Sequence, residues 1–154
     1  MLKDNHCYTY LKEKKLKKSE RIFWLLGSLD ELNAVLGIAR VFVTSSHLKK
    51  KITLIQEEIL TAGSQIVLDK DFTNFKEKTE RLEKEIEQIK KPKLKKFIKP
   101  GKKKSEVFLH FARVICRRVE REFVKEENKK WQNLIDYLNR LSLLLFWWAV
   151  KEKE

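Results

Sequence analysis

The chain has 154 residues, of which 35 are Lys or Arg and 22 are Asp or Glu, so its formal net charge is +13 at pH 7. This length fits one domain with a sizeable core, and the excess positive charge favours anionic partners such as nucleotides, nucleic acid or anionic lipid without choosing among them. Four glycines and two prolines are too few for an all-β sandwich or barrel, because such folds need many turns.

Residues 1–18 show no clear periodicity, and we expect an irregular segment with a basic run at residues 12–18. The opening MLKDNHCYTY lacks the apolar stretch of a secretion signal. The longest apolar run, LLLFWWAV, is far shorter than the about 20 residues of a membrane span. Two cysteines, Cys7 and Cys116, suggest neither a disulfide framework nor a metal site. We therefore expect a cytoplasmic protein with no membrane partner.

Apolar residues recur at three- and four-residue steps through most of the remaining chain, which predicts helices. Ser19 is a favourable cap for the first helix, and Pro92 ends the third. The expected helices span residues 22–43, 47–68, 73–91, 105–127 and 129–150. No stretch alternates with a period of two. The predicted fold is all-α, a five-helix bundle with ferritin-like up-and-down packing, as a single domain over residues 1–154.

The fourth helix contains RVICRRVERE, a stretch with four arginines. At about 100° per residue, one arc of this helix holds several polar side chains opposite the apolar face: His110, Arg113, Arg117, Glu120 and Arg121. A solvated surface with ion pairs is the ordinary interpretation. However, lysine is far commoner than arginine in this chain, and the guanidinium fork matches phosphate or carboxylate. The stripe is therefore a candidate for anion recognition, in which Glu120 orients the forks or faces a ribose.

His110 and Cys116 on this helix and Asn139 on the next helix also bear on the site. We expect His110 to be partly buried and hydrogen-bonded rather than a ligand, and Cys116 to be a core residue. Asn139 lies in a strongly apolar helix, where its amide needs partners. An interhelical hydrogen bond and a contact aimed at a ligand are equally open for Asn139.

Four segments, in order along the chain, resemble the trimeric ATP:cob(I)alamin adenosyltransferases. They are SERIFWLLGSLDELNAVLGIAR, IQEEILTAGSQI, FIKPG followed by LHFARVICRRVERE, and YLNRLSLLLFWWA. The resemblance implies a homotrimer of five-helix subunits, with ATP bound between neighbouring subunits and cobalamin beside it. Cob(I)alamin attacks the 5′ carbon of ATP, and triphosphate leaves. A cobalamin reductase is a further candidate partner.

The resemblance also implies roles for individual residues by matched position. Nucleotide or phosphate contacts are implied for Thr9, Lys18, Arg117, Glu120, Arg121 and Asn139. Asp30 and Arg113 are implied to pair between subunits, and with Arg117 they form the implied catalytic set. Phe97 is implied to crowd the lower face of the corrin. No metal ligand from the protein is implied, because Mg²⁺ is held mainly by the ATP phosphates. Cobalt is the nucleophile, so catalysis needs positioning and charge stabilisation rather than a protein base.

The chain departs from the family pattern at three places. KDNHCYT stands where the family has Thr-Gly-Asp-x-Gly-x-Thr, so Asp4 and Cys7 replace glycines and Asn5 replaces the aspartate. Leu143 replaces an aspartate, and Lys102 replaces a second glycine. Glycines let backbone N–H groups wrap phosphate closely. Two hypotheses follow: an active enzyme with a remodelled loop, or a paralogue that binds nucleotide or adenosylcobalamin without turnover.

A third hypothesis is a basic helical protein that binds nucleic acid. The net charge supports it, but the sequence shows no RNA- or DNA-binding motif. We therefore expect no nucleic-acid partner.

Overall fold

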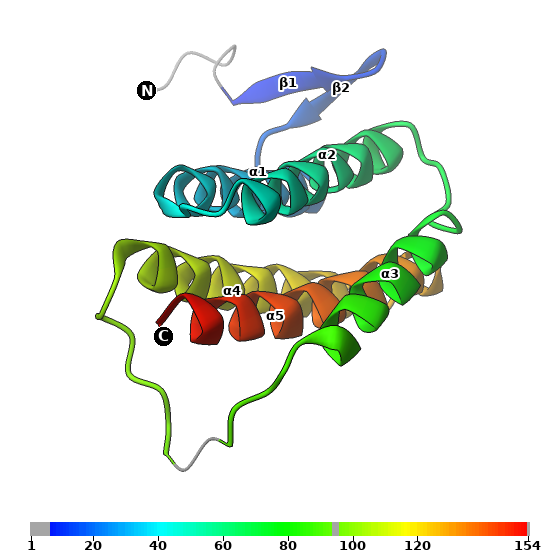
Figure 1. Ribbon diagram of the computed structural model, residues 1–154. Coiled ribbons are helices and arrows are strands. Elements are labelled where there is room, and N and C mark those ends of the chain that lie inside the picture. Colours follow the sequence, from blue (N-terminus) through cyan, green and yellow to red (C-terminus); the bar gives the residue numbers. More distant parts are fainter. Residues whose placement is uncertain (1–6, 94–95, 154) are drawn as a thin grey trace.

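The computed structural model describes residues 7–93 and 96–153, which form five α-helices and a two-stranded hairpin (Figure 1). The helices are α1 (Arg21–Phe42), α2 (Ser46–Val67), α3 (Phe75–Gln88), α4 (Lys104–Val124) and α5 (Gln132–Lys153). Helix α4 packs between α1 and α5, α2 packs on α1, and the short α3 packs on α5. The predicted all-α five-helix bundle is confirmed.

Each helix turns one apolar face into a common core. By length and composition alone, α1 could cross a membrane, but its leucines Leu25, Leu29, Leu32 and Leu36 are buried in the bundle. On α5 the corresponding stripe includes Leu134, Leu138, Leu141 and Leu145. In both helices, the residues that pack follow the three- and four-residue spacing of apolar residues from which the sequence predicts helices.

The hairpin contradicts the expectation of an irregular segment over residues 1–18, of which residues 1–6 lie outside the described part. Strands β1 (Tyr8–Leu11) and β2 (Lys14–Lys17) pair antiparallel, with Thr9 opposite Leu16. Alternation is hidden in the sequence because the outward face carries an exposed aromatic, Tyr10, opposite Lys15. The turn gives no signal either, because Lys12 adopts a positive φ of 54° that Asn or Gly usually supplies.

Several helix ends also differ from the prediction. Ser19 does not cap α1; Glu20 holds the capping position and makes no side-chain hydrogen bond there. Helix α3 begins at Phe75 and ends at Gln88, before the proline that was expected to end it. Helix α4 ends at Val124, and the 3₁₀ turn η2 (Lys129–Trp131) precedes α5, which continues to Lys153. The break follows from local geometry, because Glu127 has a left-handed φ of 48° and the Asn128 side chain caps the turn.

A buried carboxylate fastens α3 to the rest of the bundle. Glu58 on α2 is 3% exposed and accepts two hydrogen bonds from Arg81 on α3, at 2.6 and 2.8 Å. The hydroxyl of Tyr137 on α5 donates a third at 2.7 Å, and Lys78 lies 3.7 Å away. Burial alone would raise the pKa of Glu58, but the bonds from Arg81 and Tyr137 lower it below its usual value. Glu58 is therefore a charged anchor for α2, α3 and α5.

We expect Arg81→Met to lower the free energy of unfolding by about 3 kcal/mol, because it leaves a buried charge without its main partner. The control is Arg118→Met, which removes the exposed pair with Glu31 and should cost less than about 1 kcal/mol. Since the folded-state pKa of Glu58 is lowered, its contribution exists above the unfolded pKa of about 4.3 and is lost as pH falls below it. Urea unfolding at pH 7 and below pH 4 tests this, and equal losses for both variants would contradict it.

Candidate functional site

The arginine stripe of α4 points away from the core, as the helical arc predicts. Arg117 and Arg121 are exposed, and among the residues described neither guanidinium forms an ion pair or hydrogen bond. Their neighbour Arg118, on the side facing α1, does pair with Glu31. The solvated ion-pair interpretation therefore fits Arg118 but not the stripe itself, which presents two free forks to solvent.

The stripe continues toward the start of α4 with two groups that lack partners. Arg113 is half-buried, and its Nε has no hydrogen-bond partner in the described chain. Burial and then the neighbouring Arg117 lower the pKa of Arg113. One turn earlier, His110 is 4% exposed, and neither ring nitrogen is hydrogen-bonded to any described residue. The expected hydrogen bond of His110 is therefore wrong, and burial followed by Arg113 lowers its pKa, so the ring is neutral at pH 7.

Asn139 and Glu120 contact each other on the side of the stripe that faces α5. The Asn139 amide donates a hydrogen bond of 2.9 Å to the Glu120 carboxylate, joining α5 to α4. The interhelical hydrogen bond considered for Asn139 is therefore present, although Asn139 is exposed. Cys116 is a core residue as expected: burial raises the pKa of its thiol, which donates to the Leu138 carbonyl. We call Arg113, Arg117, Glu120, Arg121 and Asn139 the α4 half.

Three other predicted residues lie on the hairpin, just before α1 and on α1. Thr9 is half-buried in β1, and the Lys18 backbone N–H donates to the Cys7 carbonyl at 2.8 Å where the hairpin closes. Lys18 lines a cavity of about 640 Å³ together with Arg21. Asp30 is exposed and lines a groove between α1 and α2. We call Thr9, Lys18 and Asp30 the α1 half.

The structure does not bring the two halves together within one chain. Among the described residues, Asp30 and Arg113 form no ion pair, although the sequence resemblance implies that they do so between subunits. The Asp30 groove is lined by residues of α1 and α2 and the residue after α2, whereas the Lys18 cavity also includes Arg118 and Glu122 of α4, although no member of the α4 half.

Phe97 stands apart from both halves, in the segment that joins α3 to α4. Its side chain is fully exposed. The end of this segment is held by Glu106, which accepts backbone N–H bonds from Lys102 at 2.9 Å and Lys103 at 3.2 Å. Lys153 at the end of α5 donates to the Lys99 carbonyl at 2.6 Å. These contacts hold residues 99–103 at the end of the bundle where α4 starts and α5 ends, and Phe97 precedes them in the chain.

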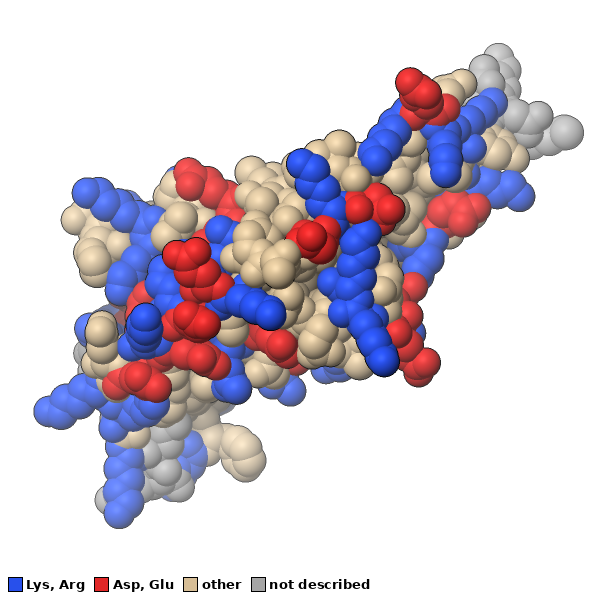
Figure 2. Space-filling view, turned by 90° about the vertical axis from the view of Figure 1, so that its right-hand side faces the viewer, with Lys and Arg blue, Asp and Glu red and all other residues tan. Residues whose placement is uncertain are grey.

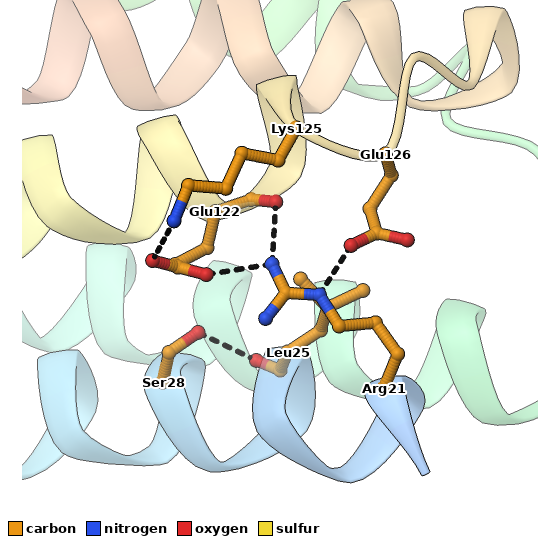
Figure 3. A network of polar contacts seen from close by, with 6 residues as sticks. All are labelled: Arg21, Leu25, Ser28, Glu122, Lys125 and Glu126. Atoms are coloured by element: carbon orange, nitrogen blue, oxygen red, sulfur yellow. Dashed lines mark hydrogen bonds and ion pairs between the residues drawn. The ribbon is translucent and has the colours of Figure 1, made fainter.

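Sequence reasoning missed an ion-pair network between the start of α1 and the end of α4 (Figure 3). Arg21, the first residue of α1, donates to the Glu122 carboxylate at 2.6 Å and to its carbonyl at 3.1 Å. The Arg21 Nε also donates to Glu126, and Lys125 binds Glu122 at 3.1 Å. One signal was available: a cation in the first turn of a helix opposes the helix dipole and needs an acidic partner.

Charge over the rest of the surface is mixed. Figure 2 shows basic and acidic side chains interspersed over one face of the helices. Within residues 7–93 and 96–153, no group of three or more His, Cys, Asp or Glu side chains is placed to hold a metal ion. The unpaired forks of the α4 half, rather than overall charge, are thus the candidate feature for anion binding.

Comparison with known proteins identifies the family of the chain. A family model described as cobalamin adenosyltransferase matches residues 3–152. The chain belongs to the cobalamin adenosyltransferase family. The resemblance drawn from the four sequence segments is thereby confirmed.

Individual relatives are moderately similar in sequence. The corrinoid adenosyltransferase of Bacillus subtilis is 34% identical over 131 residues, which cover 78% of this chain and 68% of the relative. The mouse corrinoid adenosyltransferase MMAB is 33% identical over 146 residues, covering 84% of this chain and 61% of the relative. The chain thus spans about two thirds of the length of these two curated relatives.

Solved structures of one bacterial enzyme have the same fold. A variant PduO-type adenosyltransferase from Lactobacillus reuteri, complexed with ATP, has a TM-score of 0.86 at 27% identity and covers 97% of this chain and 90% of its own. A second variant, complexed with cobalamin and ATP, has a TM-score of 0.85 at 26% identity, with 97% and 87% covered.

We expect Arg117→Lys to weaken binding of inorganic tripolyphosphate at least about 10-fold, because lysine keeps the charge but loses the fork. Arg118→Lys is the matched control, because its guanidinium already pairs with Glu31, and it should change affinity less than about 2-fold. Isothermal titration calorimetry measures both. Equal affinities for Arg117→Lys and the parent protein would mean that the stripe is ordinary solvated surface.

Proposed function

We propose that this chain is a corrinoid adenosyltransferase, which transfers the 5′-deoxyadenosyl group of ATP to cob(I)alamin and releases triphosphate. The observation that carries the proposal is the row of unpaired arginine forks beside the Glu120–Asn139 pair, in a chain of this family. The Lactobacillus reuteri relative that binds both cobalamin and ATP supports the substrates.

The reaction needs no base from the protein. The electron pair of Co(I) forms the cobalt–carbon bond at C5′, the bond from C5′ to the phosphate oxygen breaks, and its electrons leave with triphosphate. The protein's task is to hold the two substrates in line and to stabilise the charge that grows on the leaving group. Arg117 and Arg121 suit that task because each offers a planar fork to phosphate oxygens.

Mg²⁺ enters this proposal as a companion of ATP rather than as a resident ion. Glu120 is the one carboxylate of the α4 half, and it already accepts the Asn139 amide. We propose that Mg²⁺ is bound mainly by the phosphates, and that the guanidinium groups help Mg²⁺ to neutralise the negative charge of the phosphates. A cobalamin reductase as partner and a cytoplasmic location also stay predictions of the sequence.

We further propose that the site is completed between subunits of a homotrimer. Support comes from Asp30, which lines a groove between α1 and α2 and forms no ion pair with Arg113 among the described residues, and from Arg113, whose Nε lacks a partner there. Gly27, one turn before Asp30, also supports contact with another subunit at this position. Glycine inside a helix costs about 1 kcal/mol, yet a Cβ at Gly27 would meet nothing within 4 Å in this chain. Close approach of another chain would account for it.

Exposed apolar side chains also support assembly. Seven of them lie on α1 and α4: Trp24, Ile38, Val41, Phe42, Phe111, Val114 and Val124. In a head-to-tail contact, the α1 half of one subunit meets the α4 half of the next, and such a contact closes into a ring when the rotation allows. Three copies would then form three equivalent sites.

We expect Asp30→Arg to dissociate the trimer, because it places like charges across the interface, and we expect the double variant Asp30→Arg with Arg113→Asp to restore it. Glu31→Arg is the matched control, because Glu31 pairs within its own chain. Sedimentation at micromolar concentration measures the assembly. A stable monomer of the parent protein, or a trimeric Asp30→Arg variant, would contradict the shared site.

The activity itself is tested by incubating the protein with ATP, Mg²⁺ and chemically reduced cobalamin and following the spectral change to adenosylcobalamin. Arg117→Lys should lower kcat/KM for ATP at least about 10-fold, or about 1.4 kcal/mol. The second candidate function is a non-catalytic paralogue, which the replaced glycines of the phosphate loop favour. Binding of ATP and cobalamin without adenosylcobalamin formation would select that alternative.

We expect Phe97→Ala to slow the reaction of cobalamin while leaving the affinity for ATP nearly unchanged, because an exposed ring can exclude the axial base only by contact with the corrin. A corrinoid that lacks the base should be affected much less. Steady-state kinetics with both corrinoids measure the difference, and equal losses with the two would argue against this role.

A further inference from the structure

In the proposed trimer, each chain serves two different sites. Its α1 half faces one neighbour, and its α4 half faces the other. The contact between α1 and α4 inside the chain is therefore the connection between two sites. Two sets of ion pairs bridge these helices among the described residues: Arg118 with Glu31, and Arg21 with Glu122 and Glu126.

The Arg21 contact joins the start of α1 to the end of α4 (Figure 3) and is close in sequence to residues of both halves that are implied to touch phosphate. Arg21 comes three residues after Lys18, and both line the same cavity. Its main acceptor, Glu122, directly follows Arg121 on α4. Arg21 uses Nε for one carboxylate and a terminal nitrogen for the other carboxylate and a backbone carbonyl. This three-acceptor arrangement fixes both position and direction, which one ammonium group cannot do.

The hairpin depends on such a tether because it is otherwise lightly held. Its two strands are four residues each, and a two-stranded hairpin is at best marginally stable alone. Leu11 and Leu16 line a groove together with Ile22 and Ile66, and the outward face of the hairpin, with Tyr10 and Lys15, is open to solvent. At the root of the hairpin, the Lys18 backbone N–H donates to the Cys7 carbonyl, and the Glu20 backbone N–H donates to the Lys17 carbonyl. Arg21 follows directly in the chain.

We propose that Arg21 is a positioning residue that fixes the hairpin root against the last turn of α4 and so links the two half-sites of one chain. The inference rests on the proposed function. A hairpin that is ordered before ATP arrives loses less conformational freedom on binding, so Arg21 acts on the affinity for ATP rather than on the bound reacting complex.

The test uses Arg21→Met in the full-length trimer. The variant should raise the KM for ATP about three- to ten-fold, because ATP must now order the hairpin, while kcat at saturating ATP stays within about two-fold. Without ATP, the amides of residues 8–17 should exchange hydrogen faster than in the parent protein, and ATP should restore their protection. Arg21→Lys, which keeps one charge but loses the fork, should give an intermediate KM.

Arg118→Met is the matched control, because it removes the other ion pair between the same helices at similar exposure. Its KM and hairpin exchange should equal those of the parent protein. An unchanged KM in trimeric Arg21→Met, or an equal rise in Arg118→Met, would overturn the proposal. A loss confined to kcat or to the active fraction would mean that Arg21 is merely structural, and it too would overturn the proposal.

If Arg21→Met does not assemble, Glu126→Gln replaces it, because that variant weakens one acceptor and keeps the bond to Glu122. It should raise the KM by a smaller factor, and an unchanged value would refute the link. If the parent protein forms no adenosylcobalamin, the proposed function fails by itself. The link is then tested by the Kd for ATP and by hairpin exchange, which need no turnover.

Discussion

The position of α4 between α1 and α5 is the constraint on which the site depends. One side of α4 is buried by both neighbours, through Leu109, Ala112, Ile115, Val119 and Phe123. A rigid helix with one side fixed has no freedom about its axis, because rotating it would expose apolar surface at about 25 cal/mol per Å². The direction of the arginines on the other side is therefore set by the packing of these apolar residues, and not by contacts that the arginines make themselves.

This arrangement explains why unpaired cations persist on a folded protein. Arg118 on α4 and Arg21 on α1 pair with carboxylates across the contact between the two helices, whereas Arg117 and Arg121 form no ion pair in the described chain. Pairing the latter within the chain would neutralise the forks and make a phosphate ligand compete for them. Leaving them free costs little while water solvates them, and it preserves their full charge for an anion.

Features that depend on residues a few positions apart could be predicted from the sequence, and features that depend on residues far apart could not. The arc of Arg113, Arg117 and Arg121 follows from helical periodicity alone, so the sequence predicts it correctly. The hydrogen bond expected for His110 was wrong because a wheel shows the direction of a side chain but not what lies opposite it. The partners of Arg21 lie about a hundred residues away, and no local pattern names them.

By itself, the sequence determined the five helices, the apolar face of each, the arginine arc and the family, because these depend on spacing within a few turns or on matched motifs. Only the tertiary structure decided the hairpin over residues 8–17, the anchor at Glu58, and the separation of Asp30 from Arg113. The physical reason is that these features depend on groups brought together by packing of the core. Their stability comes from neighbours distant in sequence, and short-range propensity carries no record of those neighbours.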